Sequence, residues 1–188
     1  MRVTMATKRS RKHLVWIDCE MTGLDPARDV LLEIATIITG YDLEIVDRGP
    51  VLAIKQSEAR LKSMDAWNRR THGKSGLIER VRTEGIRLAE AERLTLNFVK
   101  RYCYARTAPL CGNSIGQDKR FLIKYMPRLV DFLHYKVVDV SSIKVLTNEW
   151  YAERYQAPPK RELHQALADI EESIEELRHY RNTVFVRS

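Results

Sequence analysis

The sequence predicts an α/β protein with a mixed sheet of about five strands flanked by helices. Strand-like apolar segments joined by short turns fill the first third of the chain, and short strand-like segments alternate with helix-like segments in the rest. The chain has 188 residues, of which 44% are hydrophobic and 30% are charged. This length and composition are typical of one globular domain with its own core.

The amino-terminal part is expected to form an antiparallel meander. Residues 14–20, 31–39 and about 44–54 are rich in Val, Ile and Leu, and the turn sequences GLDP and GYDLE separate them. Strands with such short connections pair antiparallel, because parallel neighbours need a longer crossover. The longest apolar stretch, VLLEIATIIT, contains Glu33 and falls short of the roughly 18 residues of a membrane span, so a transmembrane protein is excluded.

Helices and strands alternate in the remaining two thirds. The spacing of apolar residues predicts helix from about 63 to 105, followed by a short strand, APLCGN, and a helix in GQDKRFLIKYMPRLVDFL. The segment KVVDVSSIKVL predicts a strand that passes into a helix with Ser141 as its N-cap. After a loop at APPK, the last helix carries a core-facing stripe of residues spaced four and three apart: Leu163, Leu167, Ile170, Ile174 and Leu177.

The positive charge is unevenly distributed. The formal net charge is +7, but five of the 32 basic residues lie among the first twelve positions, which contain no acid. The rest of the chain is therefore nearly neutral, whereas a protein that binds long nucleic acid by neutralising phosphates carries a larger excess. Residues 1–12 are expected to be a disordered basic arm, and residues 13–188 are expected to form a single domain. Its nearly neutral charge favours a small anionic ligand, or a ligand that is contacted through metal ions, over a long duplex.

The three cysteines, Cys19, Cys103 and Cys111, form no C-x-x-C pair and no metal-finger spacing. Two of them lie in apolar strand-like segments, where a free cysteine behaves as a small hydrophobic residue. Because free thiols persist where disulfides are rare, a reducing, cytoplasmic location is expected.

Two carboxylates, Asp18 and Glu20, end the first apolar run, LVWIDCEMTGLDP. Strand alternation places both on one face, while Val15, Ile17 and Cys19 point to the other. Carboxylates so close raise each other's pKa unless a cation lies between them, and Mg²⁺ or Mn²⁺ suits such oxygen ligands. Two acids that simply solvate a strand end explain an isolated D-x-E equally well.

Further acids and a histidine occur later in the chain. Asp118 falls in the first turn of a helix in CGNSIGQDKRF, where the helix dipole alone also favours an acid. Asp169 lies beside the apolar stripe of the last helix, where an unpaired carboxylate is costly and a cation is favoured. His164 stands near the start of that helix, as a general base or as a surface or capping histidine.

These motifs, in this order, resemble the three motifs of the DEDDh superfamily of 3′-to-5′ exonucleases. They are Asp18 and Glu20 in WIDCEMTGL, Asp118 in GNSIGQDKRF, and His164 and Asp169 in HQALADI. Within the superfamily the chain resembles the oligoribonuclease family over nearly its whole length. The resemblance implies an RNase H-like fold, a homodimer, and hydrolysis of short single-stranded RNA, especially dinucleotides, to 5′-mononucleotides.

The resemblance also implies a two-metal mechanism with Mg²⁺ or Mn²⁺ held by the four acids, Asp18 being the bridging ligand. Two such ions can flank a scissile phosphate, generate hydroxide and stabilise the leaving 3′ oxygen. His164 would then accept the proton of the attacking water, since imidazole titrates near neutral pH.

Four further residues match substrate positions of the family. Leu24 and Trp67 resemble an apolar pair that stacks against substrate bases, an interaction that tolerates any base. His72 and Tyr135 match positions supplied toward the neighbouring subunit's site. Packing within the fold is the alternative role for each residue. Trp67 would then be an interior tryptophan, Leu24 a turn leucine packed on the core, and His72 and Tyr135 packing groups.

Three more residues match a cap on the 5′ phosphate of a dinucleotide. Ser114 and Ser141 match its hydroxyls, and such a cap would exclude longer chains by steric conflict. Lys136 stands where family members often carry arginine, and it keeps the charge without bidentate geometry. A turn residue and a helix cap are the alternatives for the two serines.

Two other functions are compatible with these motifs. One is a related exonuclease acting on longer single-stranded DNA or RNA ends, which the nearly neutral body disfavours. The other is a catalytically silent nucleic-acid-binding module, which the presence of all four acids and the histidine disfavours.

Overall fold

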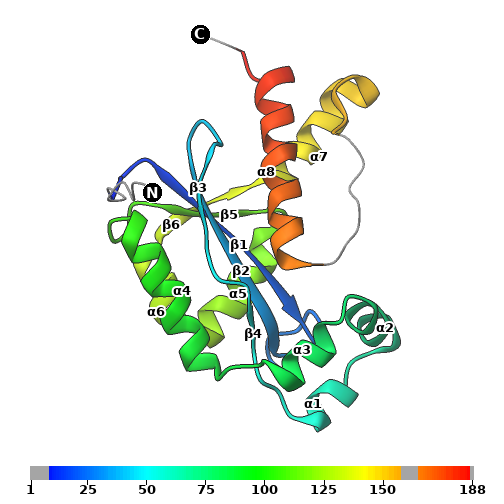
Figure 1. The fold of residues 1–188 in the computed structure, drawn as a ribbon. Helices are drawn as coiled ribbons and strands as arrows, with labels where there is room; N and C mark the ends of the chain where they lie inside the picture. The colour runs from blue at the N-terminus through cyan, green and yellow to red at the C-terminus, as the bar shows by residue number, and fades with distance from the viewer. Residues whose placement is uncertain (1–8, 158–164, 187–188) are drawn as a thin grey trace, which may run out of the picture.

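The computed structural model describes residues 9–157 and 165–186. A six-stranded mixed sheet with helices on both faces forms the body of the molecule (Figure 1). The strands are β1 (His13–Met21), β2 (Leu31–Gly40), β3 (Ile45–Arg48), β4 (Leu52–Ala53), β5 (Pro109–Gly112) and β6 (His134–Asp139). The predicted α/β class is confirmed. The predicted basic arm lies largely outside the described residues, as do Leu163, His164 and most of the APPK loop.

Helices connect the strands and cover the sheet. They are α1 (Glu58–Lys62), α2 (Ala66–Lys74), α3 (Leu77–Thr83), α4 (Leu88–Tyr102), α5 (Ile115–Tyr125), α6 (Pro127–Phe132), α7 (Val140–Tyr151) and α8 (Ala166–Thr183), with a 3₁₀ turn, η1 (Ala152–Tyr155), after α7. The strand order is β3-β2-β1-β5-β6, and β4 pairs with β2. The first three strands form the predicted antiparallel meander, whereas β5 and β6 add in parallel after helical crossovers.

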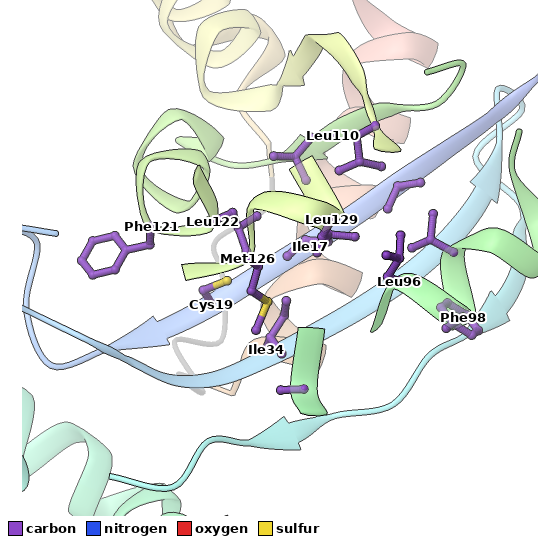
Figure 2. Close-up of a cluster of buried hydrophobic side chains, with 14 of the residues drawn as sticks. Ile17, Cys19, Ile34, Leu96, Phe98, Leu110, Phe121, Leu122, Met126 and Leu129 are labelled. Carbon is purple, nitrogen blue, oxygen red and sulfur yellow. The ribbon is translucent and has the colours of Figure 1, made fainter. Parts of the chain in front are cut away.

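Strand β1 is buried on both faces, and its alternation decides which layer each side chain joins. Val15, Ile17 and Cys19 pack in one cluster with side chains of α4, α5 and α6 (Figure 2). Leu14 and Trp16 point to the opposite face, where the stripe of α8 covers them. Asp18 and Glu20 continue the α8 side of β1 toward its carboxyl end, as the alternation predicts.

The predicted strand at 44–54 is two short strands, because Gly49 and Pro50 interrupt it. The amide of Gly49 still donates to the carbonyl of Thr36 at 2.8 Å, but Pro50 has no amide with which to continue the ladder. The predicted helix after APLCGN divides at Pro127, which starts α6.

The helical region begins earlier than predicted, at Glu58, and consists of four separate helices rather than one continuous element. Ser141 is not the N-cap of α7, because the helix begins at Val140. The carboxylate of Asp139 instead accepts a hydrogen bond from the Ser141 amide at 3.0 Å, the bond that a capping side chain makes.

The three cysteines are free and buried. Burial raises the pKa of Cys103 to about 11, so its thiol stays protonated at neutral pH. Within residues 9–157 and 165–186, no helix has the length and apolarity needed to cross a bilayer.

Candidate active site

Three carboxylates meet at the carboxyl end of β1. Asp18, Glu20 and Asp169 each offer an oxygen, and these oxygens all lie within 4.8 Å of one another. The first two come from β1 and the third from the first turn of α8, and all three side chains are half-buried. The structure thus brings three of the predicted acids together, and three carboxylates in this space suit a hard divalent cation.

The fourth acid, Asp118, lies beside the backbone of β1. Its Oδ1 accepts a hydrogen bond from the Cys19 amide at 3.0 Å, and the residue is only 7% exposed. This bond forms because β5 pairs with β1 only at Val15 and Trp16, which leaves the Cys19 amide beyond the ladder. The first turn of α5 therefore brings Asp118 to the stretch of β1 between the two acids of the D-x-E motif.

The site has an excess of negative charge. Burial, followed by the charges of Asp169, Glu33 and Asp118, raises the pKa of Glu20 to about 8, and Arg80 acts in the opposite direction. Burial likewise raises the pKa of Asp118 to about 7, although the Cys19 amide opposes this shift. Cations among these carboxylates would relieve both effects. The donor set therefore fits divalent metal ions in number, type and electrostatics.

His72 lies at the edge of this cluster, within its own chain. Its Nε2 donates to the carbonyl of Met21 at 2.9 Å, and its Nδ1 lies 3.9 Å from Oε2 of Glu20. The side chain is 2% exposed and so has almost no surface left for another subunit. The structure thus places His72 against an acid of its own chain, and the expectation that it is supplied toward a neighbouring subunit's site stays a prediction.

Leu24 and Trp67 are on the surface, with 71% and 52% of their areas exposed. Packing within the core, the alternative considered for both, is therefore wrong. Leu24 belongs to a loop that Asp29 organises, since its carboxylate accepts from the Thr22 hydroxyl and the Asp25 amide, each at 3.0 Å. Two exposed apolar side chains beside a polar site are suited to contact a ligand.

Helix α5 holds this loop and also carries the predicted fourth acid, Asp118. Gln117 donates to the carbonyl of Leu24 at 2.5 Å, and the hydroxyl of Tyr125 donates to the carbonyl of Asp29 at 2.6 Å. Asp118 lies on the same helix, next to Gln117. One rigid element therefore positions both the acid and the loop that presents Leu24.

Ser114 and Ser141 are brought together from the loop before α5 and the start of α7. Their hydroxyl oxygens lie 3.0 Å apart, and the Asp139 carboxylate accepts from both of their amides at 3.0 Å. Ser114 has a φ of 49°, and the Ser141 hydroxyl donates to Asn113 at 3.1 Å. The two predicted hydroxyls therefore lie side by side, held in place by one carboxylate and one amide side chain.

Tyr135 and Lys136 lie on β6, the edge strand of the sheet. Tyr135 is 77% exposed, and the Lys136 ammonium lies 5.9 Å from the centre of its ring. The backbone carbonyl of Tyr135 accepts from Lys119 at 3.0 Å. An aromatic ring so exposed on an edge strand is open to a ligand or to a second protein chain.

Comparison with known proteins gives the family. The family model described as Exonuclease matches residues 15–177. The chain is 56% identical to the oligoribonuclease of Paracidovorax citrulli over 95% of its own length and 92% of the relative's. It is 54% identical to the oligoribonuclease of Dichelobacter nodosus, over 94% and 97% of the two chains.

The chain belongs to the oligoribonuclease family. Among solved structures it is similar to exonuclease I of Methylocaldum szegediense, with a TM-score of 0.69 at 19% identity over 92% of this chain. It is also similar to exonuclease I of E. coli in a complex with single-stranded DNA, with a TM-score of 0.73 at 14% identity over 93% of this chain. The chain spans 41% of the length of each of these exonuclease I chains, and the likeness confirms the predicted RNase H-like fold.

Sequence reasoning missed two charged residues beside the acids. Glu33 was considered only as an interruption of an apolar run, but it is 1% exposed and forms an ion pair with Arg80 of α3. An acid in the middle of a fully buried strand is itself a signal that a partner must exist. The identity of that partner, 47 residues further along the chain, is not readable from spacing.

Proposed function

We propose that the chain is a metal-dependent 3′-to-5′ exoribonuclease that hydrolyses short oligoribonucleotides, above all dinucleotides, to 5′-mononucleotides. The observation that carries the proposal is the convergence of Asp18, Glu20 and Asp169, with Asp118 bonded to β1 beside them, in a chain of the oligoribonuclease family. An arrangement of acids alone supports phosphodiester hydrolysis in general. The relatives' name supports short RNA as the substrate.

Asp18, Glu20, Asp118 and Asp169 would hold two divalent ions, Mg²⁺ or Mn²⁺. Bound ions would supply Lewis acidity at the scissile phosphate, for the attacking water and for the leaving oxygen. The protein's own task is to keep four carboxylates in place against their mutual repulsion, which strand β1 and the starts of α5 and α8 do. His164, outside the described residues, is proposed as the base that accepts the proton of the attacking water.

Substrate recognition is proposed to use the exposed groups around the acids. Leu24 and Trp67 would stack against the two bases, with about 1 to 3 kcal/mol per stacked base and no preference among sequences. The Ser114 hydroxyl would donate to the 5′ phosphate, and the Ser141 hydroxyl, whose hydrogen goes to Asn113 in this structure, would join it after turning toward the phosphate. Lys136 would add a positive charge. A closed end at this phosphate would favour dinucleotides over longer chains.

A homodimer is proposed as the working form. Six large apolar side chains on β6 and α7 are exposed: Tyr135, Val137, Val145, Leu146, Trp150 and Tyr151. An apolar surface on an edge strand and its following helix is suited to a second copy of the chain, and Tyr135 would then reach the partner's substrate. Light scattering tests this proposal directly. A cytoplasmic location stays a prediction.

The function is tested with a length series of 5′-phosphorylated RNA from two to about twenty nucleotides, together with single-stranded DNA. We expect the largest kcat/KM for the dinucleotide, and complete loss of hydrolysis with a chelator or in Asp18→Asn. Preference for long RNA or DNA would identify a related exonuclease of different substrate range. Binding without hydrolysis at any length would identify a silent binding module.

A further inference from the structure

We propose that the ion pair between Glu33 and Arg80 is a positioning pair that keeps a fifth carboxylate out of the metal site and Glu20 in it. This inference rests on the proposed two-metal function. Neither residue belongs to the motifs that carry the resemblance, and both lie beside the acids without being among the three whose oxygens converge.

Glu33 lies directly opposite Glu20. The two are paired in the antiparallel register of β1 and β2, and opposite residues of such a pair place their side chains on the same face. The register shifts at the next position, where Met21 pairs with Leu31, so Leu32 is an extra residue of β2. A bulge beside Glu33 ends the regular face at this point, immediately after the acids.

Arg80 reaches Glu33 from helix α3. Leu77 and Val81 of this helix are buried against Leu32 in a small cluster that fixes the helix on the sheet. With these two residues facing the sheet, Arg80 lies on the adjoining side of the helix and pairs with the carboxylate. Its side chain is 33% exposed and that of Glu33 is 1% exposed, so the pair extends from solvent to the buried acid.

Charge balance gives the pair its role. Four carboxylates supply four negative charges, which equal the charge of two divalent ions, and Glu33 would be a fifth at the distance of a cross-strand neighbour. An unpaired buried carboxylate would turn toward the ions and compete with Glu20. Paired with Arg80, Glu33 is neutral as a unit, and its Oε1 accepts a hydrogen bond from Nη1 of the guanidinium.

The ion pair also joins helix α3 to strand β2, which carries Glu33. Helix α2, which carries Trp67 and His72, is joined to α3 by the two residues Ser75 and Gly76. A purely structural role for the ion pair would act through this connection alone. The two roles differ in what happens when both charges are removed together.

The experiment compares Arg80→Met, Arg80→Lys and the double variant Glu33→Gln/Arg80→Met with wild type. Arg82→Met is the matched control, because Arg82 lies on the same helix and pairs with Glu58 at the surface. The readouts are Mn²⁺ affinity of the full chain by calorimetry, thermal unfolding, and kcat and KM on a 5′-phosphorylated dinucleotide.

We expect Arg80→Met to lower kcat by about 10- to 100-fold with little change in KM. Its Mn²⁺ affinity should rise, by about tenfold, because an additional carboxylate becomes available to the ions. Arg80→Lys and the double variant should recover most of kcat and return Mn²⁺ affinity to that of wild type. Arg82→Met should behave as wild type.

Equal loss of kcat in Arg80→Met and in the double variant, or weaker Mn²⁺ binding in both, would overturn the proposal. The ion pair would then only hold helix α3 against the sheet. Failure of Arg80→Met to fold would be informative through the double variant, which must fold and turn over if the charge balance is correct. If wild type neither binds Mn²⁺ nor hydrolyses the dinucleotide, the proposed function fails independently of the pair.

Discussion

The metal-free protein should lose stability as the pH rises, and Glu20 should account for much of the loss. Its pKa is about 8 in the folded chain against an ordinary value of 4.5. The folded state therefore holds a proton that the unfolded chain has released, so stability is full below about pH 4.5 and falls as the pH rises toward 8. The slope is about 1.4 kcal/mol per pH unit for this one group, on the order of 3 kcal/mol between pH 5.5 and 7.5.

Thermal unfolding in a chelator across this pH interval measures the effect. A loss of that size corresponds to a fall in Tm of roughly 6 to 12 °C for a chain of this length. Glu20→Gln keeps the shape without the titration and should reduce the fall, whereas Glu44→Gln at an exposed position should leave it unchanged. Saturating Mg²⁺ should raise Tm more at pH 8 than at pH 6. Equal falls for wild type and Glu20→Gln in the chelator would refute the reasoning.

Three further predictions concern the residues around the acids. His164→Ala should keep the fold and Mn²⁺ binding and lose most turnover, and unchanged kcat would remove it as the base. Trp67→Ala should raise KM for the dinucleotide by about tenfold, the value of one lost stacking contact, while Tyr41→Ala, at an exposed aromatic near the opposite end of β1, keeps KM; titration of the substrate against both variants checks this. Gly23→Ala would bring a Cβ to 2.5 Å from Oδ2 of Asp29, so it should disturb the loop, raise KM and lower Tm in the same assays.

The layers of the fold were predictable because they follow from local periodicity. The alternation along β1 predicted which side chains share a face, and the spacing of Ile170 and Ile174 predicted the buried stripe of α8. The division of the predicted third strand depended on Gly49 and Pro50, whose effect on pairing is decided by neighbours on another strand. Helix α7 starts two residues earlier than a Ser141 cap would place it, because Asp139 was available as a cap.

The acids of the site were predictable individually, since each ends an apolar segment or begins a helix. Their convergence followed from resemblance and is now a geometric fact for Asp18, Glu20 and Asp169. The inward position of His72 was not predictable, because it depends on how α2 packs against the end of β1. The partner of Glu33 was hidden for the same reason, since an ion pair between distant segments leaves no spacing in the sequence.

The central claim is that the four acids at the end of β1 hold metal ions in a site that hydrolyses very short RNA. It is tested most directly by competition in one tube between a 5′-phosphorylated dinucleotide and a long single-stranded RNA at equal concentration, with Mn²⁺ present. The account predicts that the dinucleotide disappears first, and that Asp18→Asn or a chelator abolishes the reaction while the fold persists by circular dichroism. Faster loss of the long RNA, or hydrolysis that survives Asp18→Asn, would contradict it.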